Sequence, residues 1–309
     1  RISGTIEYFD RQSTNLIFAV PLPLSVGIGT ETRNIGSMYN RGIELQLAGD
    51  LVRTKDFVWN VDLNATKLEN KITKMPAESK EIIDGTKKLK EGSSLYDYWL
   101  REYKGVNPET GVAEYRAISY VASNSRITAN GDTLTNNIAN ARYWYNGTSI
   151  PDLTGSVNTS LRYKGFSLTA LMVYQLGGKI YDAAYAGLMG AGYHNAKHVD
   201  ILKRWVNPGD VTNVPRMDAG RTADFDAASD RWLIDASFMN IRTVTLSYRL
   251  PKSIMNRLKI DNAQVYVSGE NFLMLSRRSG MNVQQNFGGT TSNVYSPAKS
   301  LVLGLSFSL

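Results

Sequence analysis

The sequence predicts an all-β fold, a transmembrane antiparallel β-barrel with about ten strands. Three observations lead there: apolar and polar residues alternate, the strands are long, and short and long connections alternate along the chain. The alternation is clear in Phe57–Thr66, where Phe57, Trp59 and Val61 alternate with Val58, Asn60 and Asp62. A strict period of two marks a strand with one apolar face.

Strand length separates a membrane barrel from a soluble β-sandwich. The segments Phe57–Leu68, Ser237–Leu250 and Ile260–Asn271 each run for 12 residues or more. Strands of soluble domains usually have about 5–6 residues, whereas a tilted strand that crosses a bilayer needs about 9–11. The longest strongly apolar stretch, Leu168–Tyr174, is much shorter than the roughly 20 residues of a transmembrane helix. Length therefore favours the barrel.

Connections of two lengths follow one another. The short ones are Asp50–Asp56, Lys164-Gly165 and Pro251–Lys259. The long ones are rich in Gly and Asn, and they cover Pro21–Gly36, Glu69–Gly92, Tyr120–Asp152, Gly177–Asp235 and Leu273–Pro297. Transmembrane barrels have short turns on the periplasmic side and long loops outside the cell.

The strands can then be placed in order and given a direction. They are Arg1–Phe18, Ser37–Ala48, Phe57–Leu68, Leu95–Lys104, Gly111–Ser119, Leu153–Tyr163, Phe166–Gln175, Ser237–Leu250, Ile260–Asn271 and Ala298–Leu309. In this order the last strand descends to the periplasm, with apolar residues at every second position from Leu301. The first strand ascends, so a descending strand is expected to precede it. We therefore expect the chain to be the back part of a larger barrel.

Composition excludes several classes of protein. The chain has no cysteine and only two histidines, so a thiolate site or a histidine-based metal centre is not expected. The net charge of +7 comes from scattered basic residues, with the densest cluster at Lys87-Lys88-Leu89-Lys90. Such runs are usually solvated surface, and no nucleic-acid partner is expected. No catalytic motif, cofactor or metal site is predicted, so we do not expect an enzyme.

Several motifs together resemble one family. Asn34-Ile-Gly-Ser-Met-Tyr-Asn-Arg-Gly-Ile-Glu-Leu45 is similar to the N-x-G-x-x-x-N-K/R-G-x-E-L signature of the SusC/RagA family of TonB-dependent outer-membrane transporters from Bacteroidetes. Gly105-Val-Asn-Pro-Glu-Thr-Gly111 resembles that family's G-x-D-P-x-T-G turn, with Asn in place of Asp. Phe238-Met-Asn-Ile-Arg-Thr-Val-Thr-Leu-Ser-Tyr248 resembles its F-x-R/N-I-R-x-x-x-L-x-Y strand. The terminal Leu309 departs from the usual terminal Phe.

The resemblance implies more than the residues do by themselves. It implies that residues 1–309 are the C-terminal part of a barrel of about 22 strands that is plugged by an N-terminal domain absent from this chain. It implies a bacterial outer-membrane location, a SusD-like surface lipoprotein as a lid, and TonB contacted through the missing plug. It also implies active import of oligosaccharides or oligopeptides. A passive pore or structural barrel without energy coupling is the alternative.

Candidate substrate-binding residues are aromatic and lie in the expected external loops. They are Tyr143, Trp144, Tyr145, Tyr193 and Trp205. Aromatic rings stack on sugar rings and on peptide side chains, although packing within a loop would use the same residues. The loop Gly177–Asp235 carries more aromatic residues than a free solvated loop needs, which predicts contact with the lid or the substrate.

Overall fold

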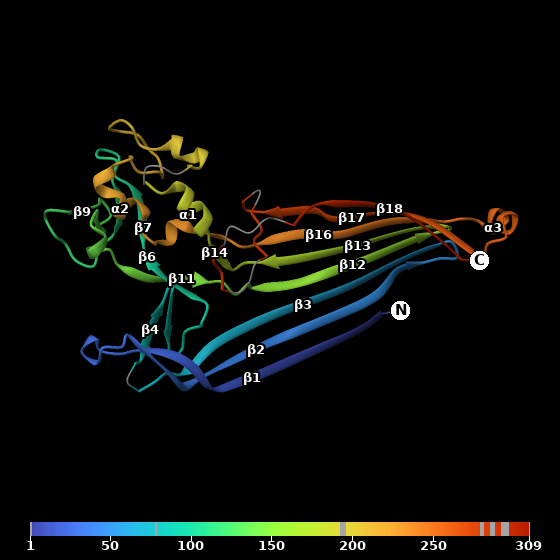
Figure 1. Cartoon of the computed structure of the whole chain (residues 1–309), viewed down its shortest axis with the longest axis horizontal. Helices are drawn as coiled ribbons and strands as arrows, with labels where there is room; N and C mark the ends of the chain where they lie inside the picture. Colours follow the sequence, from blue (N-terminus) through green and yellow to red (C-terminus); the bar gives the residue numbers. More distant parts are fainter. Residues whose placement is uncertain are drawn as a thin grey trace.

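Eight long strands form one antiparallel sheet in the computed structural model (Figure 1), in the order β1-β2-β3-β12-β13-β16-β17-β18. The structure describes residues 2–77, 79–191, 196–278, 281–284, 288–291 and 297–308. The strands are β1 (Ile2–Pro21), β2 (Thr30–Arg53), β3 (Phe57–Lys74), β12 (Leu153–Tyr163), β13 (Phe166–Leu176), β16 (Phe238–Arg249), β17 (Asn262–Ser276) and β18 (Ser300–Ser308). The all-β antiparallel prediction is confirmed.

The register places the apolar positions of the strands on one face. Trp59 lies opposite Leu161, Leu161 opposite Leu168, and Leu168 opposite Leu246. Residues that face each other in antiparallel strands point to the same side of the sheet. The same side carries Leu63 of β3 and Leu305 of β18, and the exposed side chains of Ile6, Ile43, Leu47, Val267, Leu301 and Leu303. We call this side the apolar face.

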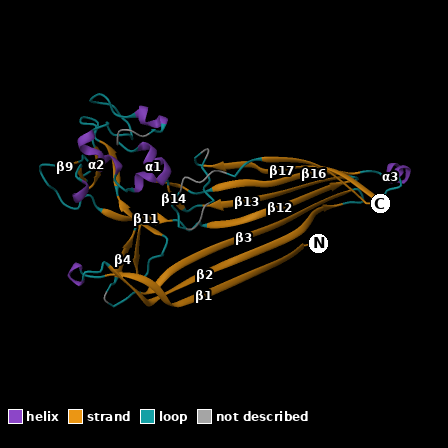
Figure 2. Cartoon of the chain, in the orientation of Figure 1, coloured by secondary structure: helices purple, strands orange, loops and turns teal. Residues whose placement is uncertain are grey.

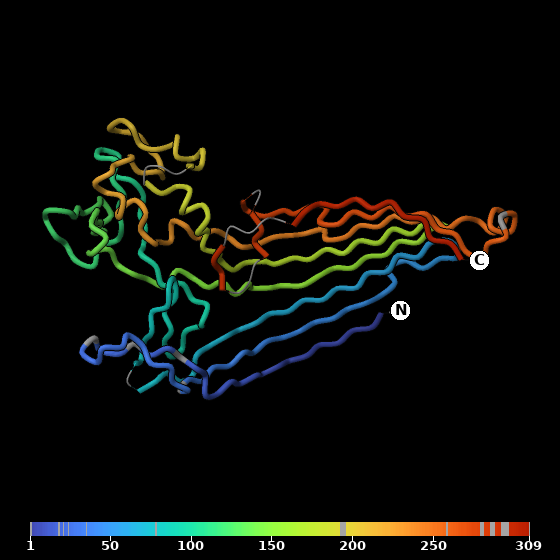
Figure 3. Tube along the Cα trace, in the orientation of Figure 1, coloured from blue at the N-terminus to red at the C-terminus, as the bar shows by residue number. Residues whose placement is uncertain are grey.

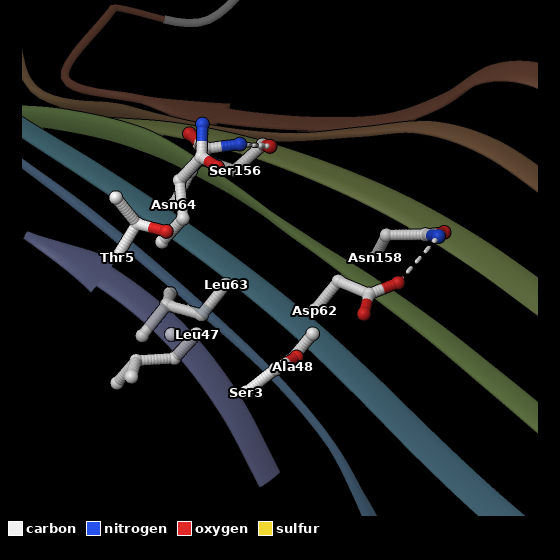
Figure 4. Close-up of a pocket in the computed structure, with 11 residues that line it drawn as sticks. Ser3, Thr5, Leu47, Ala48, Asp62, Leu63, Asn64, Ser156 and Asn158 are labelled. Atoms are coloured by element: carbon white, nitrogen blue, oxygen red, sulfur yellow. Dashed lines mark hydrogen bonds between the residues drawn. The ribbon is translucent and has the colours of Figure 1, made fainter.

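The opposite side, which we call the polar face, is lined by small and amide side chains. Figure 4 shows part of it across β1, β2, β3 and β12. The Asn64 Nδ2 donates to the Ser156 Oγ at 2.6 Å, and the Asn158 Nδ2 donates to an Asp62 carboxylate oxygen at 3.4 Å. These ladders satisfy polar groups across the sheet, so the face can stay hydrated without an apolar cover.

The two ends of the sheet differ, as the sequence predicted. The turns between β2 and β3, between β12 and β13, and between β16 and β17 lie at one end, together with both termini (Figure 3). The third turn contains the helix α3 (Lys252–Leu258). Within the described residues, β1 and β18 each pair with one neighbour and not with each other, so they are the edges of the sheet.

The count of about ten barrel strands was too high. Leu95–Lys104 and Gly111–Ser119 were predicted as barrel strands, but they join small separate sheets through β6 (Asp97–Arg101), β7 (Tyr103–Val106) and β8 (Ala113–Arg116). These strands have only 4 or 5 residues, and Tyr98, Leu100 and Tyr115 are buried in packed cores. A period of two shows that a segment is a strand, but it does not show which sheet the strand joins.

The remaining elements lie mainly in the connections at the other end of the sheet (Figure 2). The strands are β4 (Glu81–Asp84), β5 (Lys87–Lys90), β9 (Ser125–Ile127), β10 (Thr133–Thr135), β11 (Tyr143–Thr148), β14 (Lys179–Tyr181) and β15 (Leu233–Asp235). The helices are α1 (Ala183–Met189), α2 (Thr222–Asp226) and the short 3₁₀ turns Leu24–Val26, Ile138–Asn140, Val199–Lys203, Ala219–Arg221 and Asp230–Trp232. The expected loop Pro21–Gly36 is shorter than predicted, because β1 and β2 continue as a paired ribbon to Pro21 and Thr30.

Helices of the described chain are all short. None of them has both the length and the apolar character needed to cross a membrane.

Candidate substrate-facing surface

The long connections fold together into a module of their own at the long-loop end of the sheet. Residues 75–152 contribute Tyr98 and Leu100 to its core, and residues 177–237 contribute Tyr181, Phe225 and Trp232. The Trp232 side chain is almost fully buried, and its Nε1 donates to the carbonyl of Ala227 at 3.0 Å. We call this unit the loop module. Its residues pack around a buried core of their own.

A partly buried arginine lies among the aromatic rings of this module. The Arg231 guanidinium lies 4.3 Å from the Trp232 ring centroid, 5.0 Å from that of Phe225 and 5.2 Å from that of Tyr103. Burial lowers the pKa of Arg231 and raises the pKa of the Tyr103 hydroxyl to about 12. The aromatic residues of Gly177–Asp235 therefore have a structural use within the module, which accounts for part of their number.

The connection between β17 and β18 docks onto the same module. Arg278 Nε lies 2.6 Å from a carboxylate oxygen of the buried Asp182, and its guanidinium lies 3.8 Å from the Tyr185 ring centroid. Asp182 also caps α1 by accepting from the Tyr185 backbone N–H at 3.0 Å. Further along, the Gly289 carbonyl accepts from the Tyr181 backbone N–H at 2.7 Å and from the Tyr98 hydroxyl. Three connections are thus fastened to one another.

Tyr143 and Tyr145 belong to an aromatic strip on one face of the small sheet β11-β6-β5-β4. Trp99 of β6 stacks on Tyr143 with 6.1 Å between ring centroids and 17° between planes. It meets Tyr145 edge to face at 4.8 Å. Residues two apart on a strand share a face, and Trp99 is the direct partner of Tyr145. We define the aromatic strip as Trp99, Tyr143 and Tyr145.

Cations lie over the rings of the strip. The Arg101 guanidinium is 4.6 Å from the Tyr143 ring centroid, and the Lys88 Nζ is 4.2 Å from that of Trp99. A cation over an aromatic face is attracted by the negative potential of the ring. The Lys88 ammonium is also paired with a Glu81 carboxylate oxygen at 2.6 Å. The strip therefore offers flat apolar rings beside the Arg101 guanidinium, an arrangement that suits a ligand with both apolar faces and acceptor oxygens.

Trp144 points to the other side of β11, because neighbouring residues on a strand alternate. Its partner across the ladder is Leu100. The Trp144 ring is about half exposed and carries the Arg142 guanidinium 4.6 Å from its centroid. The three consecutive aromatic residues that the sequence put forward therefore do not form one binding surface.

Trp205 lies apart from the strip. Its Nε1 donates to the carbonyl of Pro108 at 2.8 Å, and its ring covers Gly111, where a Cβ would come within 2.3 Å of the Trp205 Cε3. Trp205 thus holds the turn between β7 and β8. Tyr193 lies outside the described residues. Trp99, which the sequence placed in a barrel strand, is the ring that connects two of the candidates.

A cavity of mixed polar and apolar lining lies where the polar face of the sheet meets the loop module. It has a volume of about 250 Å³ and is lined by Gln175, Lys179, Arg242, Gln284 and Gly289, among others. Arg242 occupies a bulge of β16, and its Nη2 donates to the Gln284 side-chain oxygen at 3.2 Å. The Lys179 ammonium donates to the carbonyl of Asn146 at 2.7 Å. The cavity thus has two cationic groups in its wall.

Lys87 is a further cation near this junction, and it is partly buried. Its Nζ donates to the carbonyl of Tyr96 at 2.7 Å and to the Ser149 Oγ at 3.4 Å, and it lies 3.3 Å from the centroid of the Tyr98 ring. Burial lowers the pKa of Lys87 to about 7. Among the residues that the structure describes, no three His, Asp or Glu side chains gather closely enough to hold a metal ion.

Comparisons with known proteins agree with this architecture. No family model matches the chain. TonB-dependent receptor P3 of Formosa agariphila is 26% identical over 302 residues, which cover 93% of this chain and 29% of the receptor. TonB-dependent receptor SusC of Bacteroides thetaiotaomicron is 24% identical over 327 residues, which cover 99% of this chain and 30% of SusC. The chain thus spans about 30% of the length of these curated relatives.

Solved structures of TonB-dependent transporters have the same fold as this chain. The RagAB peptide transporter matches all of this chain with a TM-score of 0.84 and 24% identity, and the matched part is 34% of that chain. The sheet and its loop module therefore define part of a β-barrel with the fold of TonB-dependent transporters. The resemblance to SusC and RagA that the sequence motifs indicated is confirmed by these relatives.

Proposed function

We propose that this chain is the C-terminal part of an outer-membrane importer that is driven through TonB. The observation that carries the proposal is the exposed apolar face, which runs through all eight strands and lies opposite a polar face. A large contiguous apolar surface marks a contact with lipid or with another protein. Strands of 9 to 24 residues are long enough to cross a bilayer.

The proposed barrel is completed by strands from a preceding part of the same transporter. Unpaired backbone groups in hydrocarbon cost several kcal/mol each, and β1 and β18 are the edges of the described sheet. We propose that both edges pair with strands of that preceding part, in a barrel of about 22 strands. Its N-terminal plug would contact TonB, and a SusD-like lipoprotein would cover the loop module from outside the cell.

The proposed substrate is an oligosaccharide or an oligopeptide. Among the similar solved structures, the RagAB transporter is described as a peptide transporter, which supports the second class. In this proposal the aromatic strip contacts substrate, while Trp144, Trp205 and Tyr193 stay candidates from the sequence alone. The ring surfaces and neighbouring cations of the strip suit either substrate class. The Gly177–Asp235 segment would form part of the external surface that meets the substrate or the lid.

Energy coupling separates this proposal from a passive pore. The test is uptake of labelled oligosaccharides and oligopeptides by the native bacterium, with the complete gene intact or deleted, and with TonB present or inactivated. We expect uptake to require both the gene and TonB. Uptake that needs the gene but persists without TonB would favour the passive pore.

The strip can be tested separately. In the complete transporter, Trp99→Ala and Tyr145→Ala should each weaken substrate binding about two- to tenfold, because aromatic pairing contributes about 0.5–1.5 kcal/mol. Tyr120→Ala is the matched control, since Tyr120 is also exposed in the loop module and lies outside the strip. Equal affinity of wild type and strip variants, with transport intact, would place the substrate elsewhere.

A further inference from the structure

Positive charge is concentrated at the short-turn end of the sheet. The three segments 50–57, 162–166 and 249–262 hold eight basic and three acidic residues, a net charge of +5, whereas the whole chain has +7. The basic residues are Arg53, Lys55, Arg162, Lys164, Arg249, Lys252, Arg257 and Lys259. The rest of the chain is much longer and contributes only the remaining +2.

Most of these basic side chains are exposed to solvent and are not neutralised by an acidic side chain that the structure describes. Arg53 pairs with Asp50 at 3.3 Å. Within the described residues, the exposed side chains of Lys55 and Lys164 form no ion pair, and neither do those of Lys252, Arg257 and Lys259 on and next to α3. Helix α3, which contains Lys252 and Arg257 and is capped by Lys259, projects beyond the strand ends (Figure 1). A cluster of exposed cations without acidic partners attracts a surface of negative charge.

A row of aromatic residues lies directly above this basic end on the apolar face. Phe57 is opposite Tyr163, Tyr163 is opposite Phe166, and Phe166 is opposite Tyr248. Tyr163 and Phe166 are each 50% exposed, and the Lys164 Nζ is 5.3 Å from the Tyr163 ring centroid. Aromatic girdles of membrane barrels sit at the level of the lipid headgroups. The basic side chains therefore lie at, or just beyond, that level.

We infer that the short-turn end binds the headgroups of anionic phospholipids in the adjacent leaflet. Headgroup phosphates that carry a net negative charge complement the exposed ammonium and guanidinium groups, and each Lys or Arg near an anionic surface adds to the attraction. The apolar face holds the acyl chains of the same lipids. The inference rests on the proposed membrane-spanning orientation and adds a lipid class and a side of the membrane to it.

The test uses the complete transporter, purified in detergent and titrated with lipid in native mass spectrometry. Phosphatidylglycerol and phosphatidylethanolamine with identical acyl chains are the two probes. The variant Lys252→Gln, Arg257→Gln, Lys259→Gln removes three charges at the basic end. The control Lys74→Gln, Lys80→Gln, Lys299→Gln removes three exposed charges outside the basic end.

We expect wild type and control to bind phosphatidylglycerol more tightly than phosphatidylethanolamine. In the triple variant at Lys252, Arg257 and Lys259, called the α3 variant, we expect the ratio of the two affinities to fall at least tenfold. A preference that survives in the α3 variant, or that both variants lose equally, would overturn the inference. Failure of this inference can be told from failure of the proposed function. The uptake experiment alone tests the proposed function, and its result does not depend on whether the transporter prefers one lipid over the other.

Discussion

Leu246 and Thr245 are neighbours in β16 that point to opposite sides of the sheet. Leu246 is half exposed on the apolar face, while the Thr245 Oγ1 lies 2.7 Å from the Ser268 Oγ on the polar face. Arginine on the lipid-facing side at mid-bilayer costs about 2–4 kcal/mol. We therefore expect Leu246→Arg to reduce insertion of the complete transporter into the outer membrane, and Thr245→Arg to leave it largely intact. The measurement is the amount of folded, heat-modifiable protein in outer-membrane fractions, and equal losses in both variants would contradict the assignment of the faces.

Lys87 gives a pH dependence to the loop module. Burial lowers its pKa from 10.5 to about 7 in the folded state, so between these values the unfolded state binds more protons. Stability of the module should therefore rise as the pH increases from 7 toward 10.5. Limited proteolysis of the loop module at pH 7.5, 8.5 and 9.5 measures this, with Lys87→Met as the reference that lacks the titrating group. We expect cleavage of the wild type to slow relative to the variant, and parallel profiles would show that Lys87 does not titrate in this range.

The turn between β7 and β8 depends on one glycine. Gly111 has φ +71°, and a Cβ there would lie 2.3 Å from the Trp205 ring. Gly131 has φ +83° and open space around its Cβ position, so it is a control for backbone strain alone. Both substitutions to Ala should cost about 1–2 kcal/mol for the left-handed conformation, and Gly111→Ala should cost more because it also displaces Trp205. Proteolysis of the module compares the two, and a larger loss for Gly131→Ala would contradict the packing of Trp205.

The elements of the sheet could be predicted from sequence far better than the loop module. Phe57–Leu68, Leu153–Tyr163 and Phe166–Gln175 fall within β3, β12 and β13 because one-sided burial imposes a period of two. The same period occurs in Leu95–Lys104, where Tyr98 and Leu100 face a local core instead of lipid. Local pattern therefore identifies a strand, whereas its partner is decided by contacts distant in sequence.

In the candidate site, too, the sequence predicts which side of a strand a residue faces but not which distant residue it contacts. Alternation along β11 already implies that Trp144 faces away from Tyr143 and Tyr145. The sequence, however, has no signal that pairs Trp99 with Tyr145, which lies 46 positions further along, or that covers Gly111 with Trp205. Those pairings follow from the fold of two connections around a shared core.

At the scale of the whole molecule, two ends of one sheet carry different chemistry. The long-loop end bears a packed module with rings and cations on its surface, and the short-turn end bears exposed basic residues below an aromatic row. Between them the sheet separates an apolar face from a polar one. This arrangement is what a barrel needs if it is to meet ligand on one side of a membrane and lie in lipid along its wall.

The most direct test of the account is accessibility along β12 in the native outer membrane. This chain contains no cysteine. Any cysteine in the rest of the complete transporter is first replaced by serine; single cysteines are then placed at consecutive positions from Ser156 to Leu161 and treated with a water-soluble maleimide. The account predicts labelling at Ser156, Asn158 and Ser160 on the polar face, and protection at Val157, Thr159 and Leu161 on the apolar face. Uniform labelling, or the reverse alternation, would contradict a barrel wall with a polar interior.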